Sequence, residues 1–146
     1  MKSDMFKITT AAVIGLGILA FQGCGTTSIE GSWNVTKVQM DGMDKPKKLD
    51  DAVKEVAQNY GEDISEEELH QEAEILSGIS LTFYENGSMN MSQGGYGISV
   101  NGTWRESGDD VYTIYANSET TDVTLDGKEL IMKDYSGDYI YIFEKN

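Results

Sequence analysis

The sequence has few of the residues on which most zinc proteins and many enzymes depend. It contains one Cys and one His, which excludes most zinc sites, Ser-His-Asp and Cys-His nucleophiles, and any internal disulfide. Positive charge is also scarce, since 11 Lys and Arg face 25 Asp and Glu, for a net charge of −14. Nucleic acid is therefore not an expected partner, because a phosphate backbone needs a basic face. No nucleophile has a recognisable base nearby, so we expect no catalysis, cofactor or metal.

The sequence does contain enough apolar material for one globular module of 146 residues, at 39% hydrophobic and 10% aromatic. Residues 1–24 differ in composition from the rest, with Lys2 and Lys7 ahead of an uncharged apolar run over residues 8–21. This run is shorter than the roughly 20 apolar residues that cross a bilayer, and small or polar residues follow it. The arrangement predicts a secretory signal.

Cys24 directly follows the apolar run, at the end of the stretch LAFQGC. This stretch resembles the lipobox of bacterial lipoproteins, in which the cysteine thiol is acylated and the signal is cut just before it. The resemblance implies a signal peptide over residues 1–23, a lipidated tether over 24–30, and anchorage to the cell membrane or outer membrane, facing away from the cytoplasm. The alternatives are an ordinary cleaved signal that leaves a free thiol, or an uncleaved helix. A lone exported cysteine without a disulfide partner favours the lipid anchor.

From Gly31 onward, short runs rich in Val, Ile, Thr, Tyr and Phe alternate with Gly, Asn, Asp and Ser. The pattern predicts eight strands, over residues 31–40, 79–85, 88–92, 96–106, 110–116, 119–125, 128–133 and 138–145. Asn86-Gly87 and Asp126-Gly127 are typical of two-residue hairpin turns that need a positive φ. Because closure removes exposed sheet edges, we predict an all-β domain over residues 31–146, folded as an eight-stranded antiparallel up-and-down barrel.

The strand rhythm is interrupted over residues 41–78. Residues 49–60 carry apolar side chains at helical spacing, with Asp50 as the expected N-cap. A second helix is predicted to begin at Ser65, where Glu68 completes a capping box, and to continue through Leu76. The sequence therefore predicts a two-helix insertion between the first two strands.

The stretch GSW at residues 31–33 resembles the Gly-x-Trp signature of lipocalins, and GTW follows at residues 102–104. Their order and spacing are similar to those of bacterial lipocalin-like domains in exported lipoproteins. In lipocalins this Trp closes one end of the barrel, often under a basic residue of the last strand. The last strand of this chain offers only Lys145, and the only Arg, Arg105, lies beside the second Trp, which departs from a typical secreted lipocalin. The helical pair is similar in layout to the portal helices of fatty-acid-binding proteins.

The inward-facing side chains define a candidate ligand site. Its predicted members are Trp33, Phe83, Met89, Met91, Val100, Trp104 and Met132. Two interpretations stay open, because such aromatic and thioether side chains either fill a solid core or line a cavity for one small ligand. The leading hypothesis is a lipid-anchored barrel that binds a small apolar or amphipathic molecule, with the helical pair as a lid. The alternative is a non-enzymatic interaction or structural module with a packed barrel, whose acidic exterior meets another envelope protein.

Overall fold

Period-two alternation produces strands close to the positions that the sequence predicts. The computed structural model describes residues 28–40, 42–134 and 137–146. The strands of this part are β2 (Gly31–Gln39), β3 (Lys47–Lys48), β4 (Ile79–Phe83), β5 (Ser88–Gln93), β6 (Ile98–Gly108), β7 (Val111–Ala116), β8 (Glu119–Asp126), β9 (Glu129–Lys133) and β10 (Ile140–Lys145). The helices of the same part are α1 (Leu49–Asn59), α2 (Glu66–Ser77) and the short 3-10 helix η2 (Gly94–Tyr96).

The sheet closes on itself to form a barrel. From β4 to β10 each strand pairs antiparallel with the next along the chain, β2 pairs with β4, and β10 returns to pair with β2. The described residues thus form a closed, eight-stranded antiparallel barrel, which confirms the predicted closure and up-and-down order. The additional strand β3 lies against β2, where Lys47 and Lys48 pair with Val38 and Lys37. The sequence did not predict β3.

The predicted hairpins form, but the predicted two-residue turns at Asn86-Gly87 and Asp126-Gly127 are wrong. The loop after β4 is longer, because the Tyr84 amide donates to the Ser88 carbonyl, and the β8–β9 turn consists of Gly127 and Lys128, since Asp126 pairs with Glu129. Gly87 has a φ of 90° between β4 and β5, and Gly127 has a φ of 64° between β8 and β9. The turn between β7 and β8 places Asn117 and Ser118 at φ 54° and 66°, as a type I′ turn requires at both central positions. These turns set the register that brings the inward faces of neighbouring strands together.

The two predicted helices lie where expected, but the start of the first one differs. Helix α1 begins at Leu49 with Lys48 as its N-cap, so the expected N-cap at Asp50 is wrong. Lys48 is held in extended backbone by pairing with β2, and the helix follows directly. The capping box of α2 is confirmed, because the Ser65 hydroxyl accepts from the Glu68 amide at 3.2 Å and the Glu68 carboxylate accepts from the Ser65 amide at 3.4 Å.

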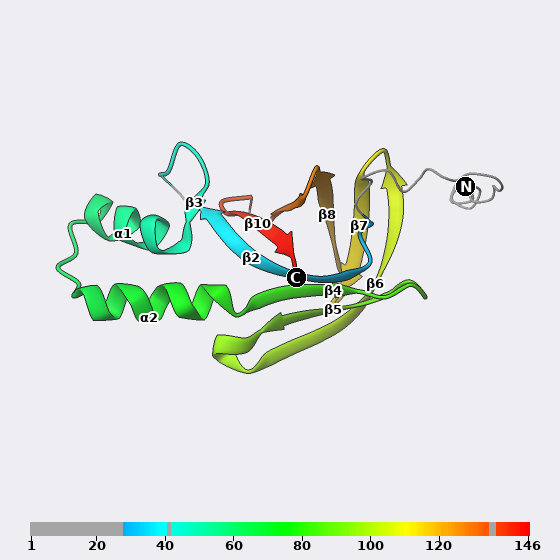
Figure 1. Cartoon of the computed structure of the whole chain (residues 1–146), viewed down its shortest axis with the longest axis horizontal. Helices are drawn as coiled ribbons and strands as arrows, with labels where there is room; N and C mark the ends of the chain where they lie inside the picture. The colour runs from blue at the N-terminus through cyan, green and yellow to red at the C-terminus, as the bar shows by residue number, and fades with distance from the viewer. Residues whose placement is uncertain (1–27, 41, 135–136) are drawn as a thin grey trace.

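The helical pair packs against one end of the barrel, away from β6, β7 and β8 (Figure 1). A second buried cluster forms there, from Val38, Met43 and Ala52. The half-buried residues Leu49, Leu76 and Tyr141 contact both this cluster and the barrel core. Within the described residues, no helix has the length and apolar character needed to cross a bilayer.

Strand β6 begins at Ile98, two residues later than predicted, because residues 94–96 form η2. This short helix sits tightly against the end of α2. The Gly94 amide donates to the Gly78 carbonyl at 3.0 Å, and a Cβ at Gly95 would lie only 3.0 Å from the Ile75 Cα. The glycines of this loop therefore permit the helical pair to approach the β5–β6 hairpin closely.

Candidate functional site

The barrel interior is occupied by apolar side chains that surround the barrel axis. The largest and most deeply buried of them are Trp33, Phe83, Phe143, Leu81, Met89, Ile114, Leu130 and Val123. None of the buried residues in the described part is polar or charged. This interior offers dispersion contacts and apolar surface, but it places no proton-transfer group at its centre.

The structure places most of the predicted ligand-site residues in this one cluster. Four of them are buried, with exposed fractions between 0 and 6%: Trp33, Phe83, Met89 and Met132. Met91 and Trp104 are half-buried and pack against the same cluster. Val100 is half-buried on β6, opposite Met91, and is not among the described residues that form the cluster. The predicted set is thus largely the core of the barrel.

Trp104 is held in place by contacts with its neighbours. Its indole Nε1 donates to the Tyr84 carbonyl at 2.9 Å, and its ring meets the Phe83 ring edge-on, with 5.9 Å between centroids. The Tyr112 ring lies at the same centroid distance on another side. Burial, with a smaller contribution from the charge of Glu106, raises the pKa of the Tyr112 phenol to about 12. This aromatic group stabilises the barrel from β4 across to β7.

Trp33 lies near the start of β2, in the core cluster. It is fully buried, and its Nε1 donates to the Ile29 carbonyl at 2.7 Å. The Lys145 ammonium lies 5.5 Å from the centroid of the Trp33 ring and donates to the Ser28 carbonyl at 2.7 Å. The first and last strands are therefore joined over the indole by a cation–π contact and by the incoming chain.

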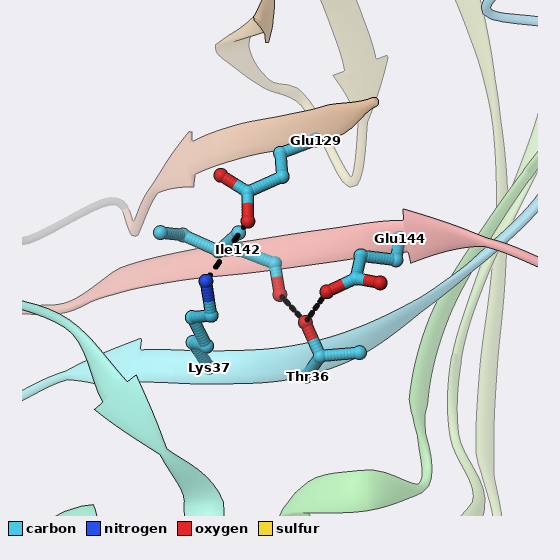
Figure 2. Close-up of polar contacts among 5 residues, drawn as sticks. All are labelled: Thr36, Lys37, Glu129, Ile142 and Glu144. Carbon is cyan, nitrogen blue, oxygen red and sulfur yellow. Dashed lines mark hydrogen bonds and ion pairs between the residues drawn. The ribbon is translucent and has the colours of Figure 1, made fainter. Parts of the chain in front are cut away.

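The seam between β2 and β10 carries a set of polar contacts on the outside of the barrel (Figure 2). The register shifts next to Ile142, so that Thr36 is an extra residue of β2. Its hydroxyl lies 3.1 Å from Glu144 Oε2 and 3.5 Å from the Ile142 carbonyl. Lys37 Nζ donates to Glu129 Oε2 at 3.0 Å, and this hydrogen bond raises the pKa of Lys37. These contacts link β2, β10 and β9 at the point of closure.

A depression of about 240 Å³ lies on the outer face of β6, β7 and β8. It is lined by Thr103, Trp104, Arg105, Thr113, Tyr115 and Thr120. Cross-strand pairing places Arg105 opposite Thr113, and Tyr115 between Thr103 and Thr120. Thr113 Oγ1 lies 2.7 Å from Asp122 Oδ1, which orients its hydroxyl. The depression thus combines a guanidinium, an aromatic ring and several hydroxyl groups.

The predicted site residues other than Trp104 do not line this outer depression. Its lining side chains other than Trp104 alternate with inward-facing ones on the same strands, so the period-two pattern already places them outside. Arg105 is the only Arg of the sequence, and this could have drawn attention to the residues around it as a candidate site. Within the described residues, no group of three or more His, Cys, Asp and Glu is placed to hold a metal ion. Cys24, the predicted attachment site, lies outside the described residues.

Comparison with known proteins identifies a similar fold. The chain is similar to the crystal structure of a DUF4847 family protein from Bacteroides vulgatus, with a TM-score of 0.52 and 15% identity. The likeness covers 80% of this chain and 93% of the other. No protein-family model and no curated protein matches the sequence. At this identity the comparison supports the barrel fold alone.

Proposed function

We propose that this protein is a lipid-anchored, extracytoplasmic, lipocalin-like barrel that acts by non-covalent binding, as an interaction module of the cell envelope. The observation that carries the proposal is the filled interior. Phe83, Leu81 and Met89 are each at most 1% exposed and belong to one apolar cluster. A barrel with a solid middle supports a rigid scaffold whose outer surface meets its partner.

The lipocalin-like assignment rests on the Trp33 end of the barrel. Trp33 stands in the Gly-x-Trp stretch of the first barrel strand, and Lys145 of the last strand lies over its ring. A basic residue over this Trp is the arrangement often found in lipocalins, with a lysine in this chain as the basic residue. The up-and-down strand order and the end-covering helical pair agree with the same assignment.

The proposed anchor would hold the barrel by its Trp33 end. Ser28 is bound to Lys145 at that end, and Cys24 precedes Ser28 by four residues, a reach of at most about 14 Å. The helical pair packs at the opposite end, around Val38. On this proposal the signal peptide is residues 1–23, the tether is 24–30, and α1 and α2 face away from the membrane.

The anchor is tested with the Cys24→Ala variant of the full chain in its host, with Thr26→Ala as the matched control. We expect Cys24→Ala to stay unprocessed and unlabelled by radioactive palmitate, because the thiol is the acyl acceptor, while Thr26→Ala is labelled normally. Normal labelling of Cys24→Ala would contradict the assignment.

The interaction role is tested by cross-linking the protein in intact cells and identifying its partners. We expect a cross-linked envelope component, and its absence would count against the module.

A second candidate function is the carriage of a small apolar or amphipathic molecule. It is favoured by the half-buried side chains of Leu49, Leu76 and Tyr141, which form an apolar layer where the helical pair covers the barrel. A movable helical pair would open this layer to a ligand. The test is mass spectrometry of molecules that co-purify with the protein, together with titration of its tryptophan fluorescence with palmitate. A released ligand and a saturable titration would support the carrier, and the lack of both would exclude it.

A further inference from the structure

We propose that the depression on the outer face of β6, β7 and β8 binds a sugar that carries one carboxylate, of the uronic acid class. The inference rests on the proposed binding role of the outer surface and does not depend on the lipid anchor. The inference is based on one observation: Arg105, Tyr115 and several threonine hydroxyls line the same depression of about 240 Å³.

Arg105 supplies the recognition of the carboxylate. Its guanidinium forms no ion pair with any other residue that the structure describes. A free guanidinium presents a planar fork of N–H donors that matches the two oxygens of a carboxylate. In a chain with a net charge of −14, long-range repulsion disfavours a ligand with many negative charges. A single carboxylate held in direct contact is the chemistry that fits.

Tyr115 and the hydroxyl groups supply the recognition of the sugar ring. The Tyr115 side chain is 48% exposed, so its ring is available to the apolar C–H face of a pyranose. Thr113 donates to Asp122 at 2.7 Å, and its oxygen lies 2.9 Å from the Ser107 hydroxyl, from which it then accepts. One lone pair of the Thr113 oxygen remains to accept from a sugar hydroxyl. The hydroxyls of Thr103 and Thr120 have no hydrogen-bond partner within the described residues.

The size of the depression limits the ligand. At about 240 Å³ it is smaller than the roughly 300–1,000 Å³ of pockets that enclose drug-sized molecules. One sugar ring, or the end residue of a longer glycan, is therefore the expected occupant. The rigid sheet beneath fixes the spacing of the donors and acceptors, since Arg105, Thr113 and Asp122 are cross-strand neighbours.

The test is a titration of the protein, purified as its cells process it, with D-glucuronate, D-glucose and acetate, followed by amide chemical shifts. We expect saturable shifts at Thr103, Thr113 and Thr120, and glucuronate bound about tenfold more tightly than glucose or acetate, because a hydrogen-bonded charge adds to the ring contacts. Arg105→Gln should abolish the preference for glucuronate over glucose. Tyr115→Ala should weaken the binding of both sugars.

Lys54→Gln is the matched control, because it removes one exposed positive charge on α1, far from β6. It should bind like the unchanged protein. No saturable shift with glucuronate, equal binding of acetate and glucuronate, or an Arg105→Gln variant that still prefers glucuronate would overturn the inference. The cross-linking experiment tests the proposed interaction role independently. A cross-linked partner without glucuronate binding would overturn the sugar site alone, whereas the absence of any cross-linked partner would count against the interaction role.

Discussion

Replacing Met89 by alanine distinguishes a solid barrel from a hollow one. Met89 is 1% exposed and lies between Phe83 and Gly102 in the cross-strand register. Loss of its three heavy atoms beyond Cβ removes about 2 kcal/mol of transfer free energy at roughly 0.8 kcal/mol per methylene-sized group. The cavity left behind raises the expected loss of unfolding free energy to about 2–5 kcal/mol.

The assay is urea unfolding followed by the fluorescence of Trp33 and Trp104, together with thermal unfolding. A loss of about 2–5 kcal/mol corresponds to a fall in Tm of roughly 8–20 °C for a domain of this size. Met91→Ala is the matched control, since Met91 lies on the same strand and is only half-buried. The Met91→Ala variant should lose at most about half as much unfolding free energy as Met89→Ala. A Met89→Ala variant that loses less than about 1 kcal/mol would refute the packing argument, because side chains that face an empty cavity have few contacts to lose.

Three further substitutions or conditions test other parts of the structure. Gly102→Ala should lower the unfolding free energy by about 1–3 kcal/mol in the same urea assay, because the new Cβ would lie 2.4 Å from the Tyr115 carbonyl oxygen; unchanged stability would contradict this. Lys145→Met should remove the cation–π contact to Trp33 and cost about 0.5–1 kcal/mol, with a shift in tryptophan emission; an unshifted spectrum would count against the contact. Tyr112 has its pKa raised to about 12, so its neutral form is favoured by folding. The contribution of this phenol to the unfolding free energy is fully present below pH 10 and should be lost between about pH 10 and 12. Urea unfolding measures that loss, and ultraviolet titration follows the phenol itself. A Tyr112 phenol that titrates near pH 10 would argue against its burial.

The strands and the closure were predictable because they depend on local patterns. Alternation of apolar and polar residues fixed the inward faces, and Gly87 and Gly127 marked the turns that pair neighbouring strands. The start of α2 was predictable for the same reason, since Ser65 and Glu68 are near each other in sequence and cap the helix locally.

The remaining features depend on contacts between distant parts of the chain. The short strand β3 consists of two lysines with weak strand preference, and it forms because β2 offers free backbone groups beyond the end of its pairing with β4. That pairing also moved the start of α1 ahead of Asp50. Likewise, η2 delays β6 to Ile98 because the end of α2 packs against it.

The candidate site was predictable only in part. The burial of Trp33, Phe83, Met89 and Met132 followed from the alternation pattern. How tightly these side chains fill the barrel depends on their packing in three dimensions, which the pattern does not encode. The outer depression depends on the register of β6, β7 and β8, which places Arg105 beside Thr113.

The most direct test of the proposed solid interior is a crystal of the protein pressurised with xenon, which enters empty apolar cavities. We expect no xenon site within the cluster that contains Trp33, Phe83 and Met89. Xenon bound there, or the elongated density of a co-purified molecule between these side chains, would contradict it.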